Sequence, residues 1–273
     1  MSEIIRYEHV DICYNGKIAV HDICFSLEEG EILGIVGESG SGKSTLLKAA
    51  LGMLGRDGLV TRGDIYYKDL DLPDIRAEKM QEISGAEIGM IFQMAGNSFC
   101  PIRTVGAQLQ EMMAAHGHDR GRAVQAEACA LFDRFGFKDP ERIWQSYPFE
   151  LSGGMQQRVG VAAAMLLKPK ILLADEPTSA LDVTVQRQVI EEMLLARKLF
   201  GTAIILVTHN IGVIRAMADS MLVLHQGEMV EYGRAENILE NPQSSYTQKL
   251  LAAVPRLRRS MTGYGRNLAS QAS

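Results

Sequence analysis

Cysteine is scarce in this sequence, and its spacing excludes several common roles. The four cysteines, at positions 13, 24, 100 and 129, are widely separated and form no C-x-x-C pair. Structural zinc sites and disulfide frameworks need cysteines at close or regular spacings. We therefore expect reduced, mostly buried thiols. The H-x-H pair His116 and His118 lies in a polar stretch, which favours solvated loop residues over metal ligands.

Long apolar runs, a basic excess and an apolar leader are also missing. The longest apolar runs, such as VGVAAAMLL and AIILV, are far shorter than the about 20 residues that a membrane-spanning helix needs. The net charge is −5 and the basic residues are scattered, so no nucleic-acid partner is expected. The start, MSEIIRYEHV, carries charges where a secretory signal has its apolar core. We expect a cytoplasmic protein that reaches a membrane only through a partner.

The apolar patterns that are present predict an α/β fold. Residues 4–27 form β-like runs broken by YNGK, a hairpin-type turn. A compact apolar run at residues 31–37 ends in glycine and precedes a helix predicted over residues 43–51. Two further strands are predicted at residues 63–72 and 88–93. A strand, a glycine loop and a helix in this order form the context that phosphate loops require.

Helical periodicity dominates from residue 94 to about residue 151, without a convincing strand. We interpret this part as an inserted helical subdomain. Strands and helices then alternate as parallel α/β units do. These are a strand at residues 171–175, a helix over 183–200, a strand at 202–209, a helix from about 211, and a hairpin at 220–233 with its turn at Gln226 and Gly227.

The stretch GESGSGKST has the spacing of a phosphate-binding loop. Its glycines let backbone N–H groups turn toward one concavity, and the following helix adds a partial positive charge. The side chain of Lys43 reaches the β- and γ-phosphates, and the hydroxyl of Ser44 suits Mg²⁺. We therefore expect ATP and Mg²⁺ as cofactors. The residues expected to hold the nucleotide are Gly37, Glu38, Ser39, Gly40, Ser41, Gly42, Lys43, Ser44 and Thr45.

Polar side chains end three further predicted strands. Asp175 suits Mg²⁺, and Glu176 suits a base that activates the attacking water. Acidic residues that end a strand are often merely solvated, so this interpretation depends on the phosphate loop. His209 is either a γ-phosphate contact or a structural hydrogen-bonding group. Gln93 suits a magnesium ligand or a water-positioning group, and Tyr14 either stacks on a base or belongs to an edge hairpin.

The stretch LSGGMQQ predicts a second anion site. Ser152 is a good helix N-cap, and Gly153 and Gly154 expose backbone N–H groups at the helix start. This site lies more than a hundred residues after the phosphate loop, although one nucleotide needs only one cradle. We expect the second site to act on a ligand held by another molecule, unless the chain folds both onto one phosphate.

Together these segments resemble the nucleotide-binding subunits of ABC transporters, over about residues 3–257. The resemblance assigns GESGSGKST to Walker A, ILLADE to Walker B with Glu176 as catalytic glutamate, LSGGMQQ with Gln156 to the signature motif, SALD with Asp182 to the D-loop, Gln93 to the Q-loop, His209 to the H-switch and Tyr14 to the A-loop. It implies two such domains packed head to tail, with each ATP between the phosphate loop of one and the signature motif of the other.

The resemblance also implies the domain organisation. The expected fold is a P-loop NTPase (RecA-like) core with an N-terminal antiparallel β subdomain and an inserted α-helical signature subdomain. The parts of the ATP-binding domain at residues 1–257 are the core at about 1–93 and 159–235, the helical subdomain at about 94–158 and a group-specific segment at about 236–257, followed by a flexible tail at 258–273.

A narrower resemblance concerns the peptide/nickel importer group. The segments ALDVTVQ, VTHNIGVI and ENPQSSYTQKLLAAVPRL are similar to that group, and GLVTRGDIYYKDLDL to its D-type ATPase. This implies a paralogous F-type ATPase partner, or otherwise a homodimer, with two permeases and an extracytoplasmic solute-binding protein. The chain would act on the inner face of the cell membrane. Peptides, nickel, metal chelates and opine-like solutes remain open as substrates.

Three features depart from that group. Asn210 stands where aspartate usually follows the H-switch, and QMAGNSFCPIRTVG differs from the usual segment after the Q-loop glutamine. No cysteine follows Cys129, so we expect no iron–sulfur cluster. The alternative function is a soluble ABC ATPase accessory factor, like those of carbon–phosphorus lyase. A third alternative, a ribosome- or DNA-associated ABC protein, would have tandem domains, a long linker or a coiled-coil insert, and this sequence shows none of them.

Overall fold

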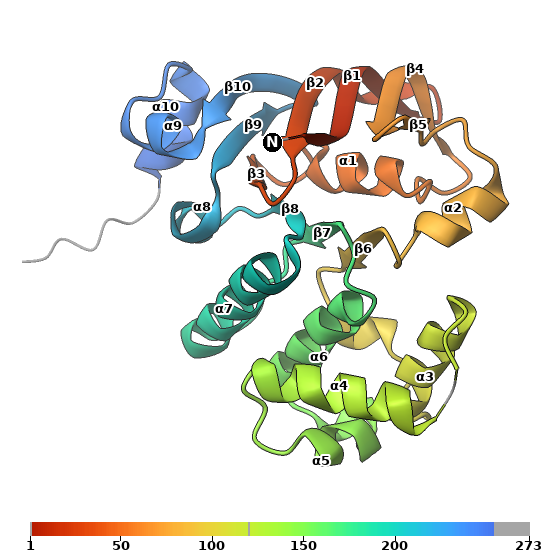
Figure 1. Cartoon of the computed structure of the whole chain (residues 1–273). Helices are drawn as coiled ribbons and strands as arrows, with labels where there is room; N and C mark the ends of the chain where they lie inside the picture. Colours follow the sequence, from red (N-terminus) through yellow and green to blue (C-terminus); the bar gives the residue numbers. More distant parts are fainter. Residues whose placement is uncertain (1, 120, 254–273) are drawn as a thin grey trace, which may run out of the picture.

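A six-stranded sheet forms the centre of the protein, in a computed structural model that describes residues 2–119 and 121–253 (Figure 1). Its strand order is β10-β9-β3-β8-β7-β6. All pairs are parallel except the edge pair β9 and β10. The bounds are β3 Ile32–Val36, β6 Ile88–Ile91, β7 Ile171–Asp175, β8 Ala203–Val207, β9 Ser220–His225 and β10 Glu228–Arg234.

The central strands are continuous apolar runs because both faces of the sheet are covered. Every residue of β3, β7 and β8 is buried. One face packs on helix α1 (Lys43–Ala50) and on the N-terminal strands. The other face packs on α6 (Gly153–Leu166), α7 (Val183–Phe200) and α8 (Ile211–Met217). The carboxyl ends of the parallel strands share one edge, which is where open α/β sheets hold ligands.

An antiparallel four-stranded sheet covers α1 in the order β2-β1-β4-β5. Its strands are β1 Glu3–Tyr14, β2 Lys17–Glu28, β4 Gly58–Tyr67 and β5 Leu70–Asp71. The expected turn at Asn15 and Gly16 joins β1 to β2, and both residues have positive φ. The hydroxyl of the buried Tyr7 donates to the Leu46 carbonyl of α1 over 2.9 Å, which ties this sheet to the core.

Helices fill the segment between β6 and β7, as expected. These elements are η1 Ala95–Ser98, α3 Val105–Ala115, α4 Arg122–Arg134, α5 Pro140–Gln145, η2 Pro148–Glu150 and α6. Helix α6 begins after the N-cap Ser152 and packs on both the helical segment and the central sheet. The domain boundary expected at residue 158 therefore falls inside α6.

The fold class is confirmed, and the helices that periodicity did not predict are short. These are α2 Ala77–Ile83, α5, α9 Ala235–Glu240 and α10 Ser245–Ala252. Each has eight residues or fewer, which is too short for a clear amphipathic period. The flexible tail expected at residues 258–273 lies outside the described residues.

Two expectations about individual side chains are wrong. The thiols of Cys13, Cys24 and Cys129 are free but only half-buried, and that of Cys100 is exposed. His116 is not a solvated loop residue, because its ring nitrogens lie 2.9 Å from the Met112 and Ser84 carbonyls. Its ring thereby joins the end of α3 to the end of α2.

A buried hydrogen-bonded contact between Arg158 and Glu192 joins α6 to α7. The guanidinium of Arg158 donates to the Glu192 carboxylate and to the Phe135 carbonyl, and it lies over the Phe137 ring. Among the described residues, the second carboxylate oxygen of Glu192 has no hydrogen-bond partner. No helix in the described ranges is both long and apolar enough to span a membrane.

Candidate functional site

The phosphate loop follows β3. At two of its positions, Gly37 and Gly42, the neighbouring strands leave no room for a side chain. Gly37, Gly40 and Gly42 have φ of 156°, 81° and 100°. A Cβ on Gly37 would lie 2.1 Å from the Leu224 carbonyl oxygen, and one on Gly42 would lie 2.6 Å from a Val20 methyl. The loop is therefore pressed against strands β9 and β2, and its backbone conformation depends on missing side chains.

Lys43 begins α1 and is buried in the loop, with 6% of its surface exposed. Its ammonium donates to the carbonyls of Gly37 at 2.9 Å and Glu38 at 2.7 Å. Burial lowers the pKa of Lys43, while the charges of Glu176 and Asp175 raise it. The lysine is thus held at the loop by the loop's own backbone, beside two carboxylates.

Oxygen ligands for a metal ion meet at the start of α1. The Ser44 hydroxyl donates to the Asp175 carboxylate over 2.7 Å. Gln93 follows β6 and lines the same cavity as Ser44. Hydroxyl, carboxylate and amide oxygens are hard ligands, and this set fits Mg²⁺.

Glu176 leaves the end of β7 in a left-handed conformation, with φ of 47°. Its N–H donates to the Val207 carbonyl at 2.9 Å. Its carboxylate lies 3.0 Å from Nδ1 of His209, which follows β8. The Glu176 side chain is 18% exposed and that of His209 is 67% exposed. The carboxylate is therefore partly shielded, oriented by an imidazole and open to water, as a general base requires.

Lys43, Ser44, Gln93 and Glu176 border one cavity of about 490 Å³, a volume typical of ligand sites. It is lined by Tyr14, Ile18, Ala19, Ser39, Gly40, Gly42, Lys43, Ser44, Thr45, Gln93, Glu176 and Gln226. The structure thus brings the predicted base, two predicted metal ligands, Tyr14 and much of the phosphate loop to one cavity. Five predicted residues nearby are not among the described residues that line it: Gly37, Glu38, Ser41, Asp175 and His209. Asp175 contacts the lining residue Ser44, and His209 contacts the lining residue Glu176.

Sequence reasoning missed Ile18, Ala19 and Gln226 as lining residues. The hairpin turn that carries Gln226 was predicted, but its direction was not. Gly227 donates its N–H to the Ser41 carbonyl at 3.2 Å, and a Cβ there would lie 2.6 Å from the Ala19 carbonyl oxygen. A glycine at a hairpin turn is the available signal, but it does not name the loop against which the turn packs.

The signature residues lie elsewhere. Ser152, Gly153 and Gly154 are not among the described residues that line the nucleotide cavity, and α6 lies with the helical segment in Figure 1. The Ser152 hydroxyl accepts the Met155 N–H at 3.3 Å, as its N-cap role predicts. No neighbouring heavy atom of the described residues comes within 4 Å of a Cβ placed on Gly153. The helix start is therefore open at Gly153, whereas a Cβ on Gly154 would lie 2.8 Å from a Val185 methyl.

Two further predicted ligands have local structural contacts. The Gln156 amide donates to the carbonyls of Pro148 at 2.7 Å and Leu151 at 3.1 Å. The Asp182 carboxylate caps α7 by accepting the Val185 N–H at 3.0 Å. Neither residue lines the nucleotide cavity in the described part of the chain. Their contact with a nucleotide stays a prediction.

Comparisons with known proteins decide the family. Residues 20–179 match the family model described as ABC transporter. The chain belongs to the ABC transporter family. Residues 230–272 of this ABC ATPase match a second model, described as the C-terminal region of oligopeptide/dipeptide transporters. This match extends past residue 257, where the resemblance was expected to end.

The relatives of this ABC ATPase are transport subunits. It is 39% identical to the oligopeptide transport ATP-binding protein AmiE of Streptococcus pneumoniae, over 88% of this chain and 68% of AmiE. It is 41% identical to the oligopeptide transport ATP-binding protein OppD of Bacillus subtilis, over 89% of this chain and 69% of OppD.

A solved structure agrees with the fold. The dimeric ATP-binding cassette MJ0796, bound to ADP and Pi in a post-hydrolysis state, superposes with a TM-score of 0.74 and is 27% identical. The match covers 85% of this chain and 99% of that one. The expected P-loop NTPase fold and the assignment as an ATP-binding, ATP-hydrolysing subunit are confirmed.

Proposed function

We propose that this ABC ATPase powers an importer of peptides or related small solutes. The observation that carries the proposal is the second match, at residues 230–272, to a C-terminal region described for oligopeptide/dipeptide transporters. The relatives named above favour an importer over the soluble accessory factor. The sequence leaves several substrates open, and the names of these relatives favour peptides over nickel, metal chelates and opine-like solutes.

The proposed working form is a head-to-tail dimer of ATPase domains. The nucleotide cavity of one chain is bordered by its own phosphate loop, whereas Ser152 and Gly153 are exposed outside that cavity and Gly154 is half-buried against Val185. A helix start with free N–H groups attracts an anion. In a head-to-tail dimer, the anion would be the γ-phosphate of the ATP held by the partner. The partner is an F-type paralogue or a second copy of this chain.

The proposed chemistry follows from the contacts of the described side chains. Ser44, Asp175 and Gln93 would hold Mg²⁺, which neutralises charge on the phosphates when bound. Glu176 accepts a proton from the attacking water, and His209 orients Glu176 and contacts the γ-phosphate. Lys43 and the signature N–H groups of the partner stabilise the charge that develops on the transferred phosphoryl group.

Asn210 replaces the aspartate of the importer group without losing a cap. Its side-chain oxygen accepts the Gly212 N–H at 2.9 Å, and its own N–H donates to the Thr208 hydroxyl at 3.0 Å. The residue thus caps α8 and shapes the turn that presents His209. We expect the neutral amide to preserve this turn and to remove one negative charge beside His209.

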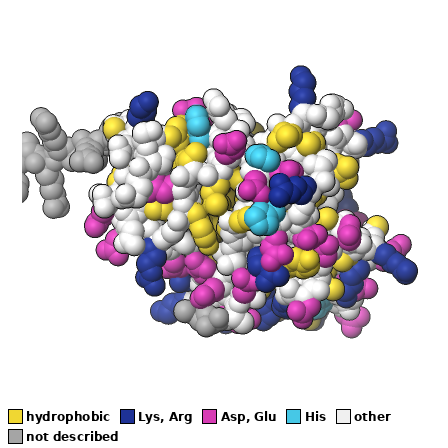
Figure 2. Space-filling view, turned by 90° about the horizontal axis from the view of Figure 1, so that it is seen from above, with side chains coloured by type: hydrophobic (Ala, Val, Ile, Leu, Met, Phe, Trp, Pro, Cys, Tyr) yellow, Lys and Arg dark blue, Asp and Glu magenta, His cyan; other side chains and the backbone are white. Residues whose placement is uncertain are grey.

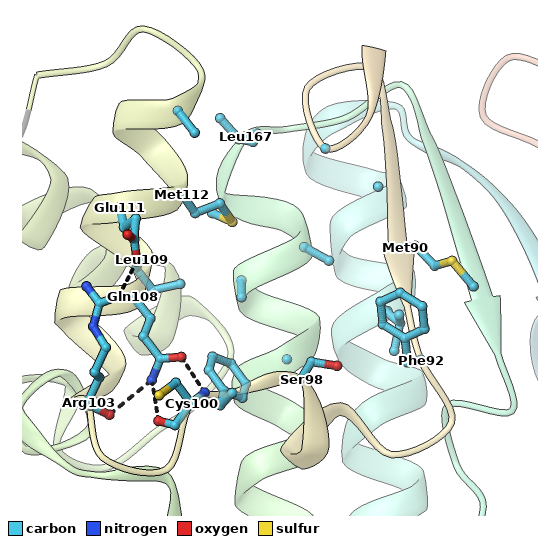
Figure 3. Close-up of a pocket in the computed structure, with 18 residues that line it drawn as sticks. Met90, Phe92, Ser98, Cys100, Arg103, Gln108, Leu109, Glu111, Met112 and Leu167 are labelled. Carbon is cyan, nitrogen blue, oxygen red and sulfur yellow. Dashed lines mark hydrogen bonds and ion pairs between the residues drawn. The ribbon is translucent and has the colours of Figure 1, made fainter. Parts of the chain in front are cut away.

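The proposed permease contact is a second cavity, of about 500 Å³, between β6, η1, α3 and α6 (Figure 3). Leu109 and Met112 of α3 line it with apolar side chains, and the Arg103–Glu111 ion pair lies at its side (Figure 3). Phe92 lines this cavity, whereas the next residue, Gln93, lines the nucleotide cavity. A movement of the backbone at Phe92 and Gln93 would therefore change both the second cavity and the nucleotide cavity.

This contact would place the subunit on the inner face of the cell membrane, beside two permeases. An extracytoplasmic solute-binding protein would deliver the cargo. Binding at the second cavity can change ATP turnover only if the permease binds the open and closed dimers with different affinity.

The test is purification of the chain with the products of its neighbouring genes, followed by reconstitution into liposomes. We expect two permeases in the complex, and ATP-dependent peptide uptake that requires the binding protein. A thermal-shift screen of that binding protein against peptides, nickel and opine-like solutes identifies the cargo. Recovery of the chain with soluble enzyme subunits and no permease would overturn the proposal.

A further inference from the structure

Three metal-binding side chains converge on the outer face of the antiparallel sheet, away from the nucleotide cavity. They are His9 of β1 and Asp22 and Cys24 of β2, and their ligand atoms all lie within 4.8 Å of one another. The His9 Nδ1 atom lies 2.8 Å from the Asp22 carboxylate and 3.4 Å from the Cys24 sulfur. Figure 2 shows histidine, acidic and basic side chains gathered on this face.

Two bulges on facing strands bring these side chains together. Tyr7 pairs with Phe25 and Val10 with Ile23, so β1 has one extra residue there. Val10 pairs with Ile23 and Ile12 with Val20, so the next extra residue is on β2. Bulges redirect side chains and are treated as built features of a sheet.

The bulges place two non-glycine residues in the left-handed region. His9 has φ of 50° and Asp22 has φ of 49°. Histidine and aspartate are among the residues that tolerate this conformation, but it still costs free energy. On the other side of β1, Gly63 approaches so closely that a Cβ would lie 2.2 Å from the Glu8 carbonyl oxygen. The surrounding backbone therefore holds the first bulge in place.

The arrangement has the geometry that a metal chelate needs, and it lacks that of a catalytic relay. A Cys–His–Asp relay needs the thiol and the carboxylate on opposite ring nitrogens of histidine. Here both approach the same atom, Nδ1 of His9. In a tetrahedral zinc site, a nitrogen and a sulfur ligand are about 3.5 Å apart, close to the 3.4 Å that separates Nδ1 and the sulfur. The nitrogen–oxygen pair would open by about half an ångström.

The neighbouring charges support the cluster on one side and oppose it on the other. The Asp11 carboxylate accepts the Asp22 N–H at 2.7 Å and lies 3.0 Å from His21 Nδ1. The Arg62 guanidinium lies 3.8 Å from the Asp22 carboxylate, in an exposed pair from which it can move away. The two carboxylates of Asp11 and Asp22 outweigh this one guanidinium in charge.

We propose that His9, Asp22 and Cys24 form a binding site for a divalent transition-metal ion of the zinc type, with a fourth position open to solvent. Imidazole nitrogen with thiolate sulfur selects zinc, nickel or copper over magnesium and calcium. The ion would join β1 to β2 across both bulges and stabilise the folded sheet by mass action. This site is independent of the proposed transport function.

The test titrates Zn²⁺ into the chelator-treated full-length chain, in the presence of reductant and without nucleotide or Mg²⁺, by calorimetry and by competition with a chromogenic chelator. We expect one equivalent of Zn²⁺ to bind, with at least about ten-fold weaker binding in Cys24→Ser and in His9→Gln. Cobalt should produce a thiolate-to-metal absorption band that Cys24→Ser abolishes. The matched variant Cys13→Ser removes another half-buried thiol of the same sheet and should bind as the parent does.

Melting temperatures measured in the presence of a chelator show whether the variants fold. A variant that folds correctly should have the same melting temperature as the metal-free parent. If a variant does not fold, thiol labelling of the parent chain, measured by mass spectrometry, still tests the proposal. In the parent chain, Zn²⁺ should slow the labelling of Cys24 and leave that of Cys13 and Cys100 unchanged. Equal Zn²⁺ affinity in parent and Cys24→Ser, or Cys24 labelling that ignores Zn²⁺, would overturn the proposal.

Discussion

The Ser44 hydroxyl donates to the Asp175 carboxylate over 2.7 Å, although 131 residues separate them in the chain. The contact joins the first turn of α1 to the end of β7, two strand positions away from β3 in the sheet. The two ends of the proposed magnesium site are therefore in place within one chain. Ser152, which the sequence predicts as part of a second anion site, is not among the described residues that line the nucleotide cavity.

Replacing the Asp175 carboxylate by an amide should uncouple metal binding from nucleotide binding. Asp175→Asn keeps the shape and an oxygen for Ser44, but it removes the charge that attracts Mg²⁺. We expect turnover to fall on the order of 10²-fold, the usual effect of losing one electrostatic contact in an active site. Nucleotide binding without Mg²⁺ should persist. ATPase assays over a Mg²⁺ series measure the effect, and Asp69→Asn, at an exposed residue outside the cavity, is the control. A parent-like Mg²⁺ dependence would exclude Asp175 from the metal site.

Glu176→Gln should block hydrolysis and keep ATP bound. The amide cannot accept a proton from water, so turnover should fall about 10²- to 10⁴-fold. The variant should form an ATP-trapped dimer with its proper partner, visible by size-exclusion chromatography. Glu78→Gln, on exposed α2, is the matched control. Hydrolysis by Glu176→Gln at the parent rate would show that another group is the base.

The sequence predicts this site well where a motif and its context are local. Asp175 ends the buried strand β7 and Glu176 follows it, while Lys43 follows the buried strand β3 through the phosphate loop. Because parallel strands end at one edge of the sheet, their convergence could be inferred. The position of Gln226 in the nucleotide cavity could not be inferred from the sequence, because it depends on how a hairpin packs against a distant loop.

The cluster of His9, Asp22 and Cys24 is equally hidden in the sequence. It depends on two bulges, and a register change of one residue would turn these side chains to the other face. The regular H-x-H spacing at His116 and His118 draws attention instead. There the structure hydrogen-bonds the His116 ring to two backbone carbonyls.

A negative charge at Gly153 should repel the ATP of the partner without harming the fold. The surroundings of Gly153 are open, and an acidic residue at a helix start is favourable to the helix. In Gly153→Asp we therefore expect an unchanged or higher melting temperature. Turnover should fall by about 10²-fold, since like charges that face each other cost several kcal/mol.

Gly153→Ala is the control for Gly153→Asp, because it adds a methyl group without charge. Differential scanning fluorimetry should show that Gly153→Asp is as stable as the parent or more stable, whereas the ATPase assay with the partner subunit should show reduced turnover. If Gly153→Asp hydrolyses ATP as fast as Gly153→Ala does, the signature residues do not face a phosphate.

Tyr246 connects the C-terminal helices to the phosphate loop. Its hydroxyl accepts the Glu38 N–H at 3.2 Å, and its ring lies 3.9 Å from the His225 ring. Tyr246→Phe keeps the ring contact and leaves the Glu38 N–H without this partner. Since one hydrogen bond contributes about 1 kcal/mol, we expect about five-fold weaker ATP binding with little change in melting temperature. Tyr232→Phe loses a bond to the Ser26 carbonyl, outside the loop, and should bind ATP as the parent does.

Glu192 should make the stability of the fold depend on pH in an unusual direction. Burial raises the pKa of Glu192 to about 7, against the opposing effect of Arg158. The second carboxylate oxygen of Glu192 has no hydrogen-bond partner among the described residues, which also favours the neutral acid. The folded state therefore binds a proton that the unfolded state, with its ordinary pKa of 4.5, releases. The contribution of Glu192 to stability is complete below pH 4.5 and is lost as the pH rises through about 7.

Glu192→Gln isolates this contribution, because the amide resembles the neutral acid and still offers an oxygen to Arg158. Urea titrations between pH 5 and pH 8 measure the free energy of unfolding across most of the window from about 4.5 to 7 and just above it. This free energy should fall more steeply with pH in the parent than in the variant. The variant should be the more stable protein at pH 8. If Glu192 were instead ionised and paired with Arg158 throughout, Glu192→Gln would be several kcal/mol less stable at every pH, because it breaks a buried ion pair. The sign of the difference at pH 8 therefore decides which form of Glu192 joins α6 to α7.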